Sequence, residues 1–352
     1  MPRREVSRRD READLVVQLA GGRNIAVLLD VEPHAGLAQS CGRTLRAFGP
    51  RDNCRFGIRE CDGGVPMAAF PAGALRRSAS MPAMTIQAEW VPIPVAAGPQ
   101  VLSTVMPAWW ARPVGVAPRA GVLVLPEVFG VNAWVRSVAE RLAEQGYAAL
   151  AISTFSRTAP DLDVGYDEAG LAAGREHRDH VTAEQLLADV AAAAAWLQQA
   201  HATDGLAGQP LGCVGFCFGG HLAMLAATRP EIAATCDFYG ARVSCFRPGG
   251  GESTLAVLPQ IPGRLWCFRG DQDPLIPAEE ITAIEESLTA ANGGHDCRSS
   301  EARHRLLIAP GAGHGYLCEA RADFRPEAAA AGWAAMLELF NRQLGSAVTT
   351  AG

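Results

Sequence analysis

Residues 215–220, Gly215-Phe216-Cys217-Phe218-Gly219-Gly220, decide the fold of this chain. An apolar run, Leu211–Gly215, leads into this stretch, and a helical segment, Leu222–Thr228, follows it. A residue at the apex of so sharp a strand-to-helix turn needs a positive φ, and its neighbours two positions away must lack a Cβ. The glycines therefore predict that Cys217 stands at the apex, at a helix N-terminus that favours negative charge on its sulfur. The alternative is a glycine-rich turn that simply buries a cysteine.

A nucleophilic cysteine needs a base, because an ordinary thiol is only a few per cent thiolate near neutrality. His314 is the candidate, since it stands between glycines directly after the apolar run Arg305–Ile308. Loops at the carboxyl ends of parallel strands gather site residues. His221 lies one turn into the helix after Cys217, so a packing or capping role is expected for it.

The acid that would orient this histidine is expected after the run Arg264–Phe268, where the sequence is Gly270-Asp271-Gln272-Asp273-Pro274-Leu275-Ile276-Pro277. Two aspartates compete for the role. Asp273 is preferred because it lies deeper in the loop before the next helix. Asp271 is more simply interpreted as a turn former. The order nucleophile, acid, histidine along the chain is that of the α/β-hydrolases.

Strand and helix signals alternate from residue 85 onward, as in a mostly parallel, doubly wound sheet flanked by helices. The fold class expected is therefore α/β, of the α/β-hydrolase type. Residues 155–180 are polar and irregular and predict a long loop. Further strands are expected at Ala88–Val95, Gln100–Met106, Gly121–Leu125 and Tyr147–Ile152, and further helices at 133–145, 182–200, 277–291 and 326–344.

Composition divides the chain into three parts. Residues 1–83 are rich in Arg, Gly, Pro and Ala and show no catalytic spacing, so they predict a loosely ordered N-terminal extension. Residues 84–345 carry the patterned domain. Residues 346–352 form a short C-terminal tail.

The stretch Leu125-Pro126-Glu127-Val128-Phe129-Gly130 ends an early central strand. In an α/β-hydrolase this loop supplies one N–H of the oxyanion hole, and the residue after the nucleophile supplies the other. Those groups would be the backbone amides of Val128 and Phe218. Glu127 is either a solvated carboxylate at the sheet edge or a group that reaches the Cys217 thiol.

Four separated motifs resemble the dienelactone hydrolase family: Leu125–Asn132, Gly215–Gly220, Gly270–Pro277 and His314-Gly315-Tyr316. The resemblance covers roughly residues 85–344. It implies a Cys217–His314–Asp273 triad that opens small esters or lactones through a thioester. It also implies that Glu127 holds the thiol in a resting arrangement until substrate displaces it.

One position departs from the family pattern. Dienelactone-specific members carry an arginine four residues after the histidine, where this chain has Cys318. Arg321 lies seven residues after His314, as in many general members. Arg175 and Arg178 precede the helix 182–200 and are further candidates to hold a substrate anion. The dienelactone itself is therefore less firmly implied than hydrolysis.

The overall composition limits the classes of partner that the protein is expected to bind. The chain has 352 residues and a formal net charge of -6, which gives no support for nucleic-acid binding. It has no lysine, so Schiff-base chemistry and a P-loop lysine are excluded. No apolar run is long enough to span a membrane. The expected partners are a small-molecule substrate and water, and the protein is expected as a monomer or homodimer.

Ten cysteines at irregular spacing, without a CxxC pair, predict reduced thiols and a cytoplasmic location. No metal-ligand spacing appears, and hydrolysis by this route needs no cofactor. Two alternatives use the same residues: a non-catalytic ligand-binding protein on the same fold, and a thiol redox protein.

Overall fold

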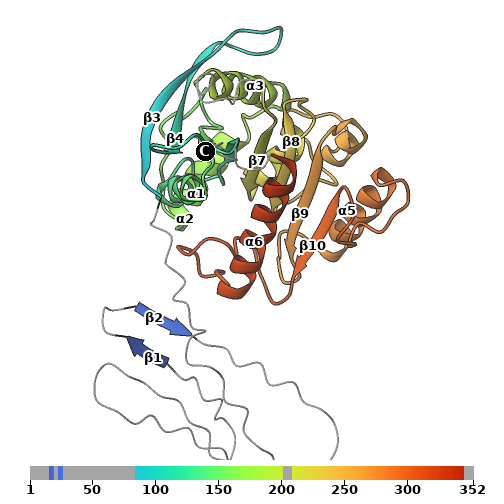
Figure 1. Ribbon diagram of the computed structural model, residues 1–352. Coiled ribbons are helices and arrows are strands. Elements are labelled where there is room, and N and C mark those ends of the chain that lie inside the picture. The colour runs from blue at the N-terminus through green and yellow to red at the C-terminus, as the bar shows by residue number, and fades with distance from the viewer. Residues whose placement is uncertain (1–15, 20–22, 27–83, 201–207, 345–352) are drawn as a thin grey trace, which may run out of the picture. The chain divides into compact units, whose positions relative to one another are not determined.

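The computed structural model describes residues 16–19, 23–26, 84–200 and 208–344 (Figure 1). The chain divides into two units, Met1–Ser78 and Ala79–Gly352. In the first, β1 (Val16–Leu19) and β2 (Arg23–Ala26) pair antiparallel. The predictions of a loosely ordered extension and of a C-terminal tail fall mostly on residues outside the described ranges.

An eight-stranded sheet forms the centre of the second unit, in the order β10-β9-β8-β7-β5-β6-β4-β3. The strands from β10 to β6 run parallel, and β4 and β3 complete one edge antiparallel. The mostly parallel sheet predicted from the sequence is confirmed. The strand bounds are β3 Ile86–Val95, β4 Thr104–Pro113, β5 Gly121–Leu125, β6 Ala148–Ile152, β7 Leu211–Phe216, β8 Ile232–Phe238, β9 Arg264–Gly270 and β10 Arg305–Ala309.

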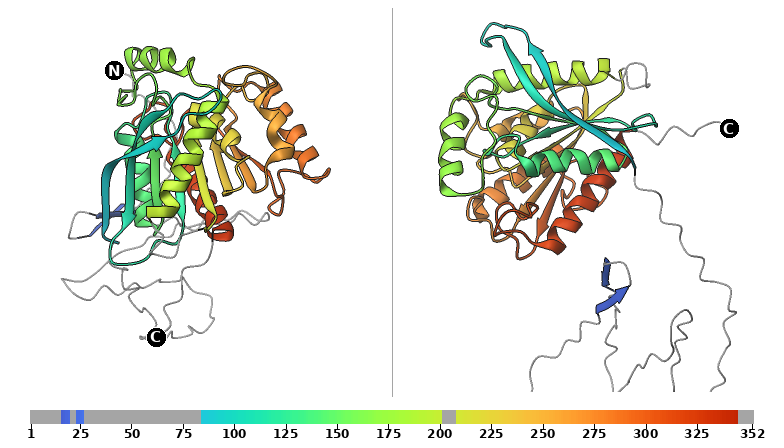
Figure 2. Two further views of the ribbon diagram at one scale, coloured as in Figure 1. Left: turned by 90° about the horizontal axis from the view of Figure 1, so that it is seen from above. Right: turned by 90° about the vertical axis from the view of Figure 1, so that its left-hand side faces the viewer.

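Helices cover both faces of the sheet (Figure 2). Apolar side chains of α1 and α6 form one core with the strands, and those of α3, α4 and α5 form the other. This is the doubly wound arrangement in which all-apolar parallel strands are buried on both sides. The helix bounds are α1 Ala133–Glu144, α2 Glu168–Arg178, α3 Ala183–Ala200, α4 Phe218–Ala226, the 3₁₀ helix η2 Thr254–Gln260, α5 Ala278–Ala291 and α6 Pro326–Gln343.

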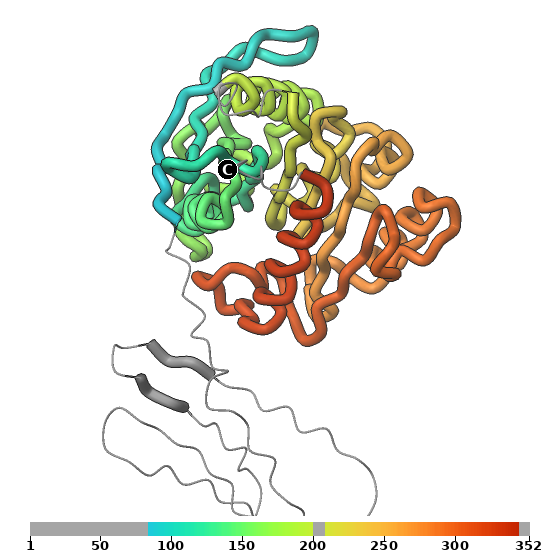
Figure 3. The backbone as a smooth tube through the Cα atoms, viewed as in Figure 1, coloured from blue at the N-terminus to red at the C-terminus, as the bar shows by residue number. Residues whose placement is uncertain are grey.

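The strand expected at Gln100–Met106 is wrong in its bounds, because β4 begins only at Thr104. Gly98 and Val101 hydrogen-bond to each other and close a turn, so Gln100 cannot be extended strand. The tube trace shows this connection projecting from the rest of the domain (Figure 3). The capping box before α3 has the expected form, since Gln185 N donates to Thr182 Oγ1 at 3.2 Å and Thr182 N to Gln185 Oε1 at 3.3 Å.

Neither α2 nor β8 was predicted. The supposed loop 155–180 contains α2, which Asp167 caps by accepting a 2.8 Å hydrogen bond from Gly170 N. Arginines in its last turn complement the helix dipole. Strand β8 also escaped prediction, although its sequence, Ile-Ala-Ala-Thr-Cys-Asp-Phe, is largely apolar. Both omissions matter, because these elements carry residues of the site.

Strand β3 forms one edge of the sheet and contains Pro92 and Pro94. Val114 N donates to Thr85 O, so the odd-numbered residues of β3 bond to the even-numbered residues of β4, and the even-numbered N–H positions of β3 face outward. Both prolines occupy outward positions, where they remove donors from the open edge.

The chain reverses direction across the sheet between β5 and β7. From β5 it proceeds to β6 on one side, and from β7 it proceeds through β8 and β9 to β10 on the other. Such a topological switch point opens a crevice beyond the carboxyl ends of the two strands. The loop after β5 and the turn after β7 therefore meet there. No helix among the described residues is long and apolar enough to cross a membrane.

Candidate active site

Cys217 stands at the apex of the turn between β7 and α4, with φ 54° and ψ −117°. The flanking glycines leave no room for a side chain. A Cβ on Gly215 would lie 1.9 Å from Gly219 O, and one on Gly219 would lie 2.2 Å from Leu125 O. Helix α4 begins at Phe218, earlier than the expected Leu222. The sulfur therefore lies directly at the helix N-terminus.

His314 and Asp273 lie in the loops that follow β10 and β9, and His314 Nδ1 is 2.8 Å from Asp273 Oδ2. Both side chains are buried. Asp271 instead accepts a 2.7 Å hydrogen bond from Gly311 N, in the loop after β10. The geometry thus brings Asp273, of the two competing aspartates, to the histidine.

The pKa of His314 is raised to about 10. Burial alone would lower it, but electrostatic interaction with the neighbouring Cys217 and the hydrogen-bonded Asp273 carboxylate outweigh burial. Nε2 makes no hydrogen bond of normal geometry with another described residue. This nitrogen is therefore available to the thiol and to a substrate.

The carboxyl end of β8 supports both catalytic candidates. Cys217 N donates to Phe238 O at 3.0 Å. Tyr239, held at a positive φ of 42°, lies edge-on to the imidazole of His314 with the ring centroids 5.3 Å apart. Tyr239 was missed because β8 was missed. An apolar run ending in Asp-Phe-Tyr-Gly was the available signal.

A buried ion pair stabilises this strand end. Arg269 Nη2 lies 2.5 Å from Asp237 Oδ2, and neither side chain is exposed. Arg269 also donates to the Asp237 carbonyl at 2.9 Å, and Gly240 N donates to Asp237 Oδ1 at 3.0 Å. These bonds pair the desolvated charges, although Arg269 Nε has no hydrogen-bond partner among the described residues, and they join β8 to β9 just below the site.

The two predicted oxyanion-hole residues line the same pocket as Cys217. Phe218 is the first residue of α4, and Val128 follows β5. Within the described chain, no group accepts a hydrogen bond from the backbone amide of either residue. Free amides at these positions are what an oxyanion would need.

Glu127 is fully buried and is bound by Arg321, whose Nη1 lies 3.0 Å from Glu127 Oε1. Burial raises the pKa of Glu127, while Arg321 and nearby His314 act in the opposite direction. Gly315 makes this contact possible, because it has a φ of 83° and a Cβ there would meet Arg321 Nε at 2.5 Å. No hydrogen bond joins Glu127 to Cys217 in the described chain.

The cleft beside Cys217 has two adjoining compartments of about 220 Å³ and 240 Å³. Both include Val128, Arg175, Arg178, Cys217, Leu275 and His314 in their walls. Phe218, Phe246 and Arg242 complete the first, while Tyr166 and Arg321 help to line the second. An apolar cleft with a few charged groups and a nucleophile is typical of a small-molecule site.

The structure brings all three predicted anion-binding arginines to this cleft. Arg175 and Arg178 project from α2, which the sequence had suggested was a loop. Arg178 is paired with Asp179 at 2.7 Å. Cys318 is buried near Glu127 and Tyr166, and burial raises its pKa to about 11. A cysteine thus occupies the position where the family pattern has an arginine.

His221 packs beneath the cleft, in keeping with the role expected for it. Its Nδ1 lies 2.8 Å from Ala241 O and its Nε2 lies 2.7 Å from Thr254 Oγ1. Burial lowers its pKa to about 4. The ring therefore stays neutral at physiological pH and ties the loop after β8 to α4.

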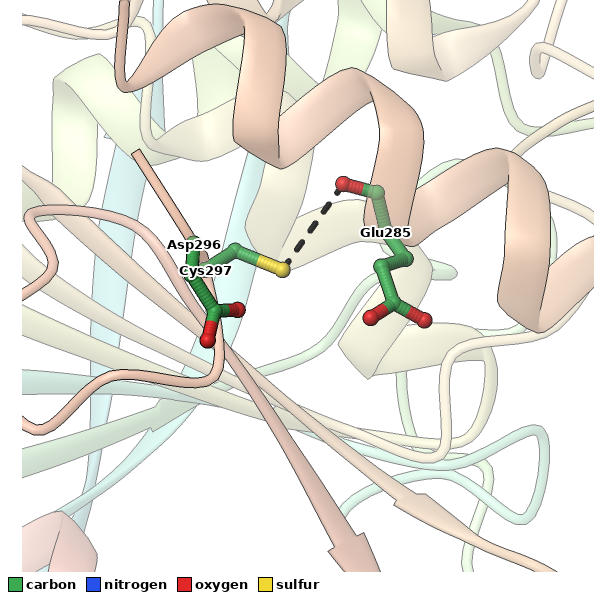
Figure 4. Close-up of side chains that lie close together, drawn as sticks. All are labelled: Glu285, Asp296 and Cys297. Atoms are coloured by element: carbon green, nitrogen blue, oxygen red, sulfur yellow. Dashed lines mark hydrogen bonds between the residues drawn. The ribbon is translucent and has the colours of Figure 1, made fainter. Parts of the chain in front are cut away.

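A separate group of potential metal ligands, Glu285, Asp296 and Cys297, lies between α5 and the segment before β10 (Figure 4). Cys297 Sγ is 3.7 Å from the Glu285 carbonyl oxygen. However, the Glu285 carboxylate already binds Arg298 through two bonds of 2.6 and 2.7 Å. A guanidinium thus occupies the place where a cation would bind.

Fold and site together define an α/β-hydrolase with Cys217 at the apex of the turn between β7 and α4. The model of the dienelactone hydrolase family matches residues 106–344. The chain is 36% identical over 234 residues to a "Putative carboxymethylenebutenolidase" of Synechocystis sp., covering 66% of this chain and 90% of that protein. It is 30% identical over 228 residues to a "Probable 2-oxo-3-(5-oxofuran-2-ylidene)propanoate lactonase" of Bradyrhizobium sp., covering 64% and 85%.

Among solved structures, a "Putative Dienelactone Hydrolase" of Klebsiella pneumoniae is similar, with a TM-score of 0.61 and 27% identity. That similarity covers 73% of this chain and 99% of the other. The chain belongs to the dienelactone hydrolase family, as the motifs in its sequence had indicated, and is a hydrolase of esters or lactones.

Proposed function

We propose that this protein hydrolyses small esters and lactones by covalent catalysis, with Cys217 as nucleophile, His314 as acid and base, and Asp273 as the group that orients the imidazole. The observation that carries the proposal is the shared cleft of Cys217 and His314, with His314 Nδ1 held by Asp273 at 2.8 Å. Carboxymethylenebutenolidase and lactonase relatives support the substrate class.

In the first half of the reaction, the Cys217 thiolate attacks the substrate carbonyl carbon and forms a C–S bond. The carbonyl oxygen becomes an oxyanion, stabilised by the amides of Val128 and Phe218. The intermediate collapses, the C–O bond breaks, and the leaving oxygen takes a proton from His314 Nε2. The product of this half is a thioester, to which the alcohol of a lactone remains tethered.

In the second half, neutral His314 removes a proton from water, and the resulting hydroxide attacks the thioester carbonyl. The C–S bond breaks and the acid leaves. Cys217 returns as thiolate beside the protonated imidazole, so atoms and charge balance over the cycle. Asp273 remains ionised and stabilises the imidazolium.

Glu127 is proposed as the carboxylate that holds the thiol at rest and is displaced when substrate binds. Arg321 Nη1, 3.0 Å from Glu127 Oε1, holds this buried side chain in place. Arg175, Arg178 and Arg321 are proposed to contact an anionic group of the substrate, and all three reach the cleft. Cys318 in place of an arginine argues against the dienelactone as the preferred lactone.

A reducing, cytoplasmic location is proposed as well. It is supported by the cysteines of the described ranges, which are all free thiols. The proposal treats the catalytic unit as a monomer or homodimer, because every proposed catalytic group comes from one chain. No metal or organic cofactor takes part in the proposed steps.

The test is turnover of 4-nitrophenyl acetate and of a lactone panel by wild type, Cys217→Ala and the control Cys245→Ala. Cys245 is an exposed thiol outside the cleft. Cys217→Ala is expected to lose hydrolysis while remaining folded, and a rapid quench of the wild type should trap an acylated Cys217 by mass spectrometry. Undiminished turnover by Cys217→Ala would falsify the proposal. Stabilisation by a lactone that is never cleaved would point to a non-catalytic binder.

A further inference from the structure

Arg242 has an unusual backbone conformation for its residue type. Cys217, Tyr239 and Arg242 are the non-glycine residues with positive φ in the described chain, and Arg242 has φ 64°. Such conformations are unfavourable for residues with a Cβ and persist mainly at functional sites. Cys217 is the proposed nucleophile and Tyr239 contacts His314. Arg242 is the remaining case, and the proposed chemistry does not use it.

The loop that carries Arg242 is firmly positioned. The Arg242 carbonyl accepts a 2.9 Å hydrogen bond from Phe246 N, which closes a turn. This turn brings the Phe246 ring beneath the Arg242 guanidinium, with Cζ 4.6 Å from the ring centroid. His221 binds the preceding residue, Ala241, and so joins the loop to α4, the helix that starts directly after Cys217. The guanidinium is therefore presented at the cleft by a rigid support.

The charges around the first compartment are unbalanced. Arg175, Arg178 and Arg242 line it, and no carboxylate belongs to its walls. Arg178 is already paired with Asp179. Arg175 and Arg242 have no carboxylate partner in the part of the chain that the structure describes. They come from α2 and from the loop after β8, with the apolar side chains of Phe218 and Leu275 also in the wall.

We propose that Arg242 is a specificity-determining residue that binds a carboxylate of the substrate on the wall formed by the loop after β8. This inference rests on the proposed hydrolase function. Arg242 would provide a second contact for the negative charge of the substrate, separate from Arg175 and Arg178 of α2. The preferred substrates are then anionic esters or lactones whose carboxylate lies toward Arg242 and whose apolar part packs on Phe246.

The first experiment compares kcat/KM for a neutral ester, 4-nitrophenyl acetate, with that for an anionic one, mono-4-nitrophenyl glutarate. Wild type should prefer the anionic ester, and added salt should weaken the preference because Arg242 is exposed. Arg242→Gln should reduce the ratio of the two constants by about tenfold, the usual size of a hydrogen bond to a charged group. Arg242→Lys should keep part of the preference.

Two matched variants separate substrate binding by Arg242 from the general effects of nearby positive charge and of backbone strain. Arg247→Gln removes a positive charge from the same loop outside the cleft and should leave the ratio unchanged. Arg242→Gly removes the side chain and also relieves the positive φ. It should therefore lose the preference while keeping a melting temperature close to that of wild type.

Glutarate binding tests the contact without turnover. Measured by calorimetry on Cys217→Ala, its Kd should increase about tenfold when Arg242→Gln is added. Unchanged ratios in Arg242→Gln and Arg242→Gly, or an unchanged glutarate Kd, would overturn the role of Arg242. Failure of wild type to hydrolyse either ester would instead count against the proposed function, and the binding measurement would still decide on Arg242.

Discussion

At the scale of single residues, two neighbouring groups, Asp273 and Cys217, determine the pKa of the His314 imidazole. Asp273 binds Nδ1 at 2.8 Å, and Cys217 lines the same cleft as the imidazole. Their negative charges raise the pKa of His314 to about 10 in spite of burial. The imidazole of His314 should therefore carry its extra proton at neutral pH.

Asp273→Asn should lower the pKa of His314 and reduce kcat. Loss of the corresponding carboxylate from a serine triad costs on the order of 10⁴ in rate.

A histidine whose folded pKa exceeds its unfolded value of about 6.5 adds stability below pH 6.5. That contribution should decline as pH rises from 6.5 to about 10 in wild type, and over a narrower range in Asp273→Asn. Imidazole titration by NMR and urea unfolding at several pH values measure both effects, with Asp271→Asn as control. Identical titrations of His314 in wild type and Asp273→Asn would refute the assignment.

At the scale of secondary-structure elements, the site depends on how closely α4 approaches the end of β5. Gly219 is the contact point, since a Cβ there would lie 2.2 Å from Leu125 O and 2.4 Å from Pro126 O. These are backbone atoms of the segment that leads to Glu127 and Val128. The turn and the oxyanion loop can therefore keep their spacing only if residue 219 is glycine.

Gly219→Ala should displace α4 from β5 and separate Cys217 from the amide of Val128. We expect a loss of about 1–3 kcal/mol in unfolding free energy. A misplacement of this kind should reduce kcat/KM by at least about 10²-fold. Gly165→Ala is the control, because a Cβ at Gly165 would have no neighbour within 4 Å. Equal activity of the two variants would show that the spacing is not critical. Urea unfolding and ester hydrolysis provide the two measurements.

At the scale of the whole molecule, buried neutral histidines make the fold sensitive to acid. Burial, with Arg303 and Arg264 nearby, lowers the pKa of His304 to about 4. Its Nδ1 accepts a 3.3 Å hydrogen bond from Leu265 N, which requires that nitrogen to be unprotonated. The unfolded chain binds a proton near pH 6.5. Stability from this residue is thus complete above pH 6.5 and is lost as pH falls toward 4.

His304→Gln retains an acceptor and should flatten the dependence of stability on pH between about 4 and 6.5. The difference from wild type across this window should be up to about 3 kcal/mol. Exposed His295 provides the comparison, since His295→Gln should leave the slope unchanged. Urea titrations at half-unit pH intervals give the slopes. Parallel curves for wild type and His304→Gln would contradict the expectation.

Much of this architecture was accessible from sequence, because glycine spacing and apolar runs are local. The turn at Cys217 and the strands β5, β7, β9 and β10 follow from such patterns. Strand β8 was missed although its pattern is apolar, and α2 was missed because it contains Gly170 and Gly174 and is surrounded by polar residues. Arg242 left no local signal. Its role depends on a φ value and a contact with Phe246 that only the folded chain reveals.

The prolines of β3 have a practical consequence. An open sheet edge ten residues long invites a neighbouring molecule to add its own strand, which is how many concentrated proteins begin to precipitate. Pro92 and Pro94 remove two of the outward-facing N–H donors that such docking requires. Aggregation during storage at high concentration should therefore begin at other surfaces of the molecule. Replacing either proline, for example to rigidify or tag the domain, would restore an N–H donor to this edge and remove the protection.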